Sequence, residues 1–110
     1  MTFEEIHDKI LAGGKSATLA EATECGRSLT TYGGKSQQMF AVVLAESKKM
    51  FDGNEEKWAS WAVAEFHLKS KNNTQHIRQI GDVLCALREE DFKLFQRFLS
   101  TSMSKLYELY

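Results

Sequence analysis

The sequence predicts an all-α protein, a compact bundle of about six helices, and three observations support this. The 110 residues contain no proline. No run of β-branched residues alternates apolar and polar side chains as a half-buried strand would, whereas apolar residues recur at spacings of three and four along most of the chain. Thr-x-x-Glu, the capping-box pattern that opens helices, occurs at Thr2 and again at Thr18.

Length and composition predict one domain over residues 1–110. With 43% hydrophobic and 26% charged residues, the chain has the composition of a soluble globular protein. No export signal and no apolar run near twenty residues is present, so we expect a cytoplasmic protein without a membrane partner. Cys25 and Cys85 suit a reducing compartment as buried thiols, and a single disulfide is the alternative.

Four helices are expected between residues 2 and 67. The first begins at the Thr2 cap and ends at the glycines 13–14, and the second runs from Thr18 to about residue 32 with a thin apolar face. The third, about 35–51, has the strongest amphipathic pattern and should form the central core. Asn54 is a candidate cap for the fourth.

The tetrapeptide Gly-Gly-Lys-Ser occurs twice, at 13–16 and 33–36. A phosphate-binding P-loop needs a further glycine five residues before the Gly-Lys pair and a strand leading into it. Lys9 and Leu29 occupy those positions, and no strand is expected before either. We therefore interpret the glycines as helix ends and each serine as the cap of the next helix.

Two helices are predicted at 55–67 and 71–87. A short polar corner joins them, which is the outline of a helix-turn-helix. The first of them carries Trp58 and Trp61, which we expect in the core. Any of the residues 72–74 can cap the second. Its inward stripe should turn towards the tryptophans and consists of Ile77, Ile80, Leu84 and Leu87.

The opposite side of that second helix has side chains suited to a DNA groove. Gln and Asn pair with adenine edges, Arg pairs with guanine, and Lys reaches phosphates. No acid occurs between His67 and Gly81. The predicted DNA-binding residues are Lys69, Lys71, Asn72, Gln75, Arg78 and Gln79. A net charge of −1 and a pI near 6.3 do not indicate nucleic acid, and the alternative is a solvated helix face.

Three short motifs carry a resemblance over about Val43 to Gly81. They comprise Leu44, Glu46 and Lys48, then Trp58 and Trp61, then Phe66, Leu68, His76 and Ile77. The span resembles a family of uncharacterised helical proteins of phages, prophages and plasmids with a presumed helix-turn-helix. Where that family has Ser, Thr and Ala at the start of its recognition helix, this chain has Lys69, Asn72 and Asn73. The resemblance implies a mobile-element origin and contact with DNA.

The last helix is expected over about 89–110, opened by three acids. One apolar stripe should consist of Phe92, Phe95, Leu99, Met103, Leu106 and Tyr110. Leu94, Phe98 and Leu109 fall outside this stripe. A helix that is apolar on more than one face is either enclosed by its own domain or shared with a partner. We predict that these three residues form the interface of a two-fold homodimer.

No pattern indicates catalysis or a cofactor. Neither C-x-x-C nor H-E-x-x-H is present to hold a metal, and no serine or cysteine lies in a nucleophile motif. We therefore expect no enzyme, no metal and no cofactor. Two functions remain: a small, dimeric, phage- or plasmid-type regulator that binds double-stranded DNA, and a protein-interaction module such as a phage-encoded inhibitor of a host defence or replication complex. Either would act in the bacterial host's cytoplasm.

Overall fold

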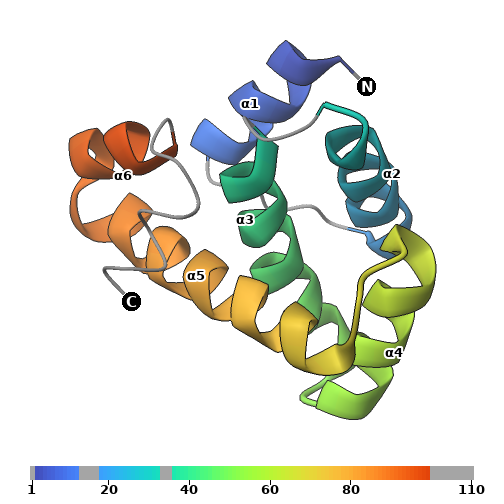
Figure 1. Cartoon of the computed structure of the whole chain (residues 1–110). Helices are drawn as coiled ribbons and strands as arrows, with labels where there is room; N and C mark the ends of the chain where they lie inside the picture. The colour runs from blue at the N-terminus through green and yellow to red at the C-terminus, as the bar shows by residue number, and fades with distance from the viewer. Residues whose placement is uncertain (1, 13–17, 33–35, 100–110) are drawn as a thin grey trace.

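Helix α3 (Gln37–Lys48) lies at the centre of the molecule (Figure 1). The computed structural model describes residues 2–12, 18–32 and 36–99, which contain helices and no strands. Every residue of α3 from Gln38 to Ala45 is buried. A helix buried on all sides must be enclosed by others, and α2 (Leu19–Thr30) and α5 (Lys71–Glu90) pack on it. The predicted all-α bundle of about six helices is confirmed.

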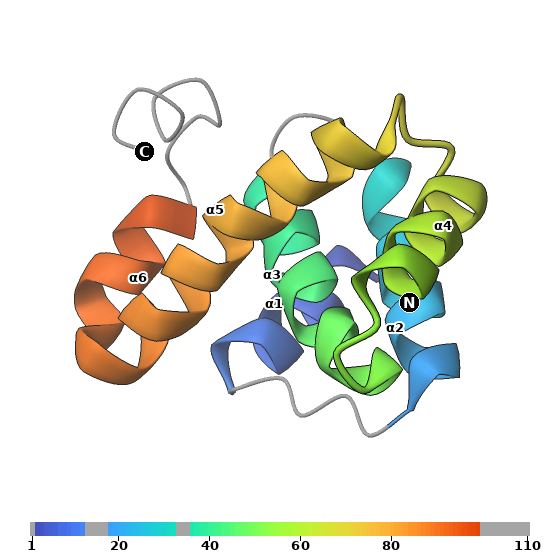
Figure 2. The same ribbon diagram turned by 90° about the horizontal axis from the view of Figure 1, so that it is seen from below.

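The other elements complete this enclosure. Helix α1 (Phe3–Leu11) contacts α2 and α3, and the short turn η2 (Lys49–Phe51) extends α3. Helix α4 (Glu55–Phe66) packs on α2, α3 and α5. Helix α6 (Phe92–Leu99) lies at the C-terminal end of α5 (Figures 1 and 2). The part of the last predicted helix beyond residue 99 lies outside the described residues.

Three helices begin at the predicted caps. The side-chain oxygens of Thr2, Thr18 and Asn54 each accept the backbone N–H three residues further on, at 3.0–3.2 Å. Each bond satisfies one of the N–H groups that a helix start leaves without a partner. These caps were predictable because donor and acceptor lie within one turn.

Two other cap predictions were wrong. Ser36 precedes α3 without capping it, because its buried hydroxyl donates to the Leu29 carbonyl oxygen at 2.7 Å and ties α2 to α3. Helix α5 is capped by Ser70 rather than by a residue in 72–74, since the Ser70 hydroxyl accepts the Asn73 N–H at 3.0 Å. The predicted Ser16 cap lies outside the described residues.

The tryptophans lie in the core, but α5 does not turn chiefly towards them. Trp58 is fully buried and donates from Nε1 to the Ser47 hydroxyl at 3.0 Å. Trp61 is half-buried between the rings of Phe51 and Phe66. Helix α5 packs mainly on α3 and less on α4. The buried stripe of α5 was thus predicted correctly, whereas its main neighbour was not.

Candidate interaction surface

The two helices of the predicted pair are both present and are joined by residues 67–70. His67 ends α4 in the left-handed conformation at φ 54°, and the next N–H, that of Leu68, donates to the Val63 carbonyl oxygen at 3.3 Å. Helix α5 then starts at Lys71 and packs against α4. The corner therefore holds the start of α5 beside α4.

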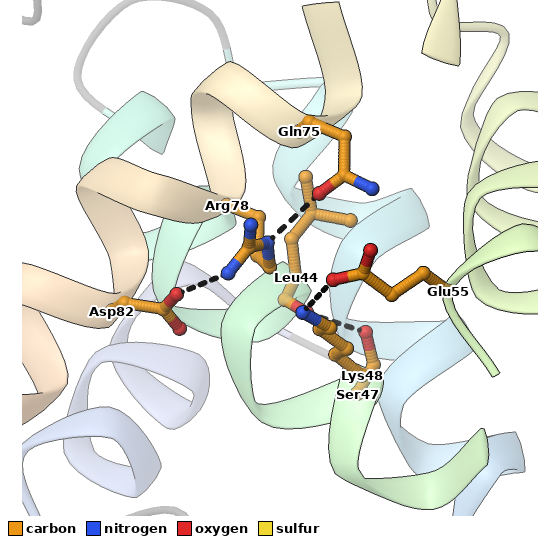
Figure 3. Close-up of polar contacts among 7 residues, drawn as sticks. All are labelled: Leu44, Ser47, Lys48, Glu55, Gln75, Arg78 and Asp82. Carbon is orange, nitrogen blue, oxygen red and sulfur yellow. Dashed lines mark hydrogen bonds and ion pairs between the residues drawn. The ribbon is translucent and has the colours of Figure 1, made fainter. Parts of the chain in front are cut away.

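Arg78 is not available at the surface in the way the sequence suggested. Its side chain is only 14% exposed, and it forms an ion pair with Asp82 one turn later (Figure 3). Its Nε donates to Gln75 Oε1 at 3.1 Å. The prediction that Gln75 and Arg78 project freely into solvent was wrong, because the three side chains satisfy one another.

A second ion pair lies beside Arg78 and joins α3 to α4. Lys48 pairs with Glu55, as Figure 3 shows, and Ser47 donates to the Leu44 carbonyl oxygen just behind it. The Lys48 ammonium, with a smaller contribution from Arg78, lowers the pKa of the Glu55 carboxyl. The positive charge of Arg78 is therefore offset by carboxylates at the junction of three helices.

The remaining predicted DNA-binding residues differ in exposure. Lys71 is exposed but forms an ion pair with Glu56 of α4, which is also exposed. Lys69 and Asn72 are exposed, and Gln79 is half-buried. The corner and the first turn of α5 thus present one lysine each, with a carboxylate beside Lys71. Its positive potential is smaller than the acid-free sequence from 67 to 81 implied.

The C-terminal half of α5 has a different character. Its outer side and the start of α6 form an exposed surface, here named the α5–α6 face, made of Asp82, Val83, Ala86, Glu89, Glu90, Asp91 and Phe92. Val83 is 46% exposed and Phe92 is 43% exposed. Arg88, the one base between Asp82 and Phe92, turns inward with 9% of its side chain exposed, and the next base, Lys93 of α6, is exposed. The face is therefore acidic around apolar side chains.

Arg88 forms a buried polar centre that the sequence interpretation missed. Its Nη1 donates to Glu46 Oε1 at 3.0 Å and to the Ile10 carbonyl oxygen at 3.1 Å. The guanidinium carbon lies 5.8 Å from the centre of the Phe95 ring. One side chain of α5 thus joins α1, α3 and α6. Its position four residues after Leu84, on the apolar stripe, was the available signal.

The predicted partner residues of the last helix are not its most exposed ones. Leu94 and Phe98 are half-buried, and Phe98 packs on the core. Leu109 lies outside the described residues. Phe92, expected on the inward stripe, is exposed because Phe95 and Leu99 occupy the buried side of this short helix. Among the described residues of α6, the exposed large apolar side chain is thus Phe92.

Neither cysteine is activated as a nucleophile. Burial raises the pKa of the Cys25 thiol, and burial together with the nearby Glu46 raises that of Cys85 to about 11, so both are protonated at neutral pH. The two cysteines are thiols rather than a disulfide. No group of three His, Cys, Asp or Glu side chains that could hold a metal occurs in residues 2–12, 18–32 and 36–99.

One hollow opens between α1, α2 and α3. Its volume is about 20 Å³, which is room for roughly one water molecule. It is lined by Ile6, Lys9, Ile10, Ala22, Cys25, Val43, Glu46 and Met50. Such a volume cannot hold a substrate or a cofactor. Over the described part of the chain, no helix is both long and apolar enough to span a bilayer.

Comparison with known proteins adds no further assignment. No protein-family model, no curated protein and no solved structure matches this chain. The resemblance to a phage and plasmid family therefore stays a prediction.

Proposed function

We propose that the protein is a non-enzymatic interaction module that binds another protein through the α5–α6 face. The observation that supports this most is the exposure of Val83 and Phe92 among carboxylates. Aromatic and apolar side chains supply most of the binding energy at protein interfaces, and a charged rim around them selects the partner. The surface therefore offers two apolar side chains that a partner can cover and charges that can select this partner.

The charges of this face define the chemistry of its partner. Asp82, Glu89, Glu90 and Asp91 are exposed, while Arg88 is turned inward. Carboxylates that line one surface accelerate encounters with a positively charged partner and disfavour a negatively charged one. We propose a protein partner that presents Lys or Arg side chains around an apolar centre. Given the resemblance to phage and plasmid proteins, inhibition of a host defence or replication complex is the role we propose.

Site-specific photocrosslinking tests this proposal. A photoreactive amino acid is placed at position 83 or 92 in the full chain, expressed in the native host cell, and the same residue is placed at Lys57, which is exposed on α4. Protein adducts are expected from positions 83 and 92 and not from position 57. Adduct formation should fall at high salt, because charges contribute to the encounter. Adducts no stronger than those from position 57 would contradict the proposal.

Binding of duplex DNA is the second candidate function. Exposed Lys69 and Asn72 at the start of α5 favour it, since the first residues of a recognition helix make most base contacts. The ion pairs of Lys71 and Arg78 weigh against it and place it second. Fluorescence anisotropy with a labelled duplex at low salt tests it. A DNA regulator would bind, and Lys69→Ala with Lys71→Ala would weaken binding at every sequence and reduce its salt dependence.

A further inference from the structure

Resting on the proposed function, we infer that one partner of this surface is a second copy of the chain, docked with the two α5 helices antiparallel. In this arrangement Lys71 of each copy faces Glu89 of the other. In this register the two-fold axis passes at the level of residue 80, so the exposed Val83 and Ala86 of each copy lie to one side of it, at the level of Ile77 and Thr74 of the other copy.

The spacing of the charges along α5 supports this pairing. Lys71 and Glu89 are both exposed and eighteen residues apart, which is five turns at about 3.6 residues per turn, so they lie on one edge of the helix. A two-fold axis perpendicular to α5 brings the same edge of both copies together in opposite directions. Lys71 and Glu89 then meet twice, once at each end of the contact.

The charges in the middle of this edge do not repel the second copy. Arg78 and Asp82 lie there and already form an ion pair with each other. Along the edge the order is therefore cation, neutral ion pair, anion. In an antiparallel second copy this order is reversed, so the cation of each copy faces the anion of the other. Lys71 can change partners, because its pair with Glu56 is exposed on both sides and such pairs contribute little to stability.

The helix dipole gives a second, independent reason. The first turn of α5 contains Lys71 and no acid, while Glu89 and Glu90 lie in its last turn. Each charge is placed against the dipole of its own helix. An antiparallel neighbour reverses both relationships, because each lysine then lies beside a negative helix end and each glutamate beside a positive one. Within one chain, the acids lie beside the start of α6, and Lys71 is offset by the exposed Glu56 of α4.

The surface involved predicts a weak dimer. One helix face buries less than the roughly 800 Å² per partner of standard interfaces. We therefore expect association in the micromolar to millimolar range that weakens as salt is added. Sedimentation equilibrium of the full chain over this range, at low and high salt, measures it.

Charge reversal tests the pairing directly. Lys71→Glu and Glu89→Lys each place like charges opposite one another twice, and each is expected to raise the dimer Kd by about tenfold or more. The double variant restores opposite charges and should return to within about threefold of the original Kd. Ala20→Glu, at an exposed position in the first turn of α2, is the matched control and should leave the Kd unchanged.

A loss of dimerisation in these variants can be distinguished from a loss of folding. Each single variant brings a charge into line with its own helix dipole, and the exposed pair with Glu56 that Lys71→Glu removes contributes little, so the unfolding temperature should stay close to that of the parent chain. A chain that is monomeric at every concentration, or a double variant no better than the singles, would overturn the self-pairing. If position 83 crosslinks to a different protein while the chain is monomeric, the self-pairing fails and the proposed function stands. If positions 83 and 92 form no adduct, both fail.

Discussion

Gly81 of α5 lies in direct backbone contact with Ala41 of α3. A methyl group on Gly81 would be 1.9 Å from the Ala41 carbonyl oxygen and 3.0 Å from the Cβ of Ala45. The first distance is far shorter than any real contact and the second is tighter than most, and the nearest atom belongs to backbone that cannot move aside. Helix α5 therefore crosses α3 at its one position without a side chain, and this crossing sets the direction in which the α5–α6 face points.

Gly81→Ala should destabilise the protein although alanine favours helix. The gain in helix propensity is at most about 1 kcal/mol, while forced separation of two packed helices costs about 3 kcal/mol. Urea unfolding measures the free energy of unfolding. Gly26→Ala is the comparison and should destabilise the protein less. Its methyl group would lie 2.4 Å from the Phe66 ring, but a ring can rotate away whereas the Ala41 carbonyl cannot. Equal stability of Gly81→Ala and the parent chain would contradict the packing described.

Ser47→Ala should destabilise the chain by about 1–3 kcal/mol, because it leaves the buried Trp58 Nε1–H without its acceptor. Chemical unfolding followed by circular dichroism gives the value. Introducing Trp58→Phe removes the donor as well, so Ser47→Ala should cost less in that background. If the cost is the same in both backgrounds, the hydrogen bond does not couple the two residues.

Arg88→Met should destabilise the protein by about 3–5 kcal/mol, because it leaves the Glu46 carboxylate buried without its partner. The double variant Glu46→Met with Arg88→Met removes both charges and should regain most of that loss. Thermal and urea unfolding of the parent chain, of Arg88→Met, of Glu46→Met and of the double variant measure this. A double variant as unstable as the sum of the singles would show that the pair is not coupled.

Stability should depend on pH through Glu46. Burial raises the pKa of this carboxyl above its usual 4.5 in spite of Arg88, which acts in the opposite direction. The native state therefore binds the proton more tightly than the unfolded chain does. The contribution of Glu46 to the free energy of unfolding is greatest below its unfolded pKa and is lost as pH rises through the native pKa.

The variant Glu46→Gln isolates this effect, because glutamine cannot titrate. As pH falls from 7 towards 4.5, the parent chain should gain stability relative to the variant. Urea unfolding of both chains at several pH values measures the difference. A difference that is constant with pH, or that changes in the opposite sense, would show that the Glu46 carboxyl is not shifted upward.

Helix positions and most helix starts could be predicted from the sequence, because their causes are local. Thr2, Thr18 and Asn54 cap helices through bonds to residues three positions away. The central position of α3 followed from its apolar pattern. Local reasoning fails at Ser36, because its hydroxyl donates to the Leu29 carbonyl oxygen of α2 instead of accepting a nearby N–H of α3.

The surface was decided by contacts between segments far apart in sequence. Arg78 and Arg88 have the same charge and lie ten residues apart, yet one is paired on α5 itself and the other reaches Glu46 and Ile10. Phe92 is exposed because the short α6 buries Phe95 and Leu99 instead. Sequence alone determined that the chain forms helices and where α1, α2 and α4 begin, since capping and periodicity act within one or two turns. Tertiary structure decided which charges are neutralised and which apolar side chains face solvent, because those depend on partners that only packing brings together.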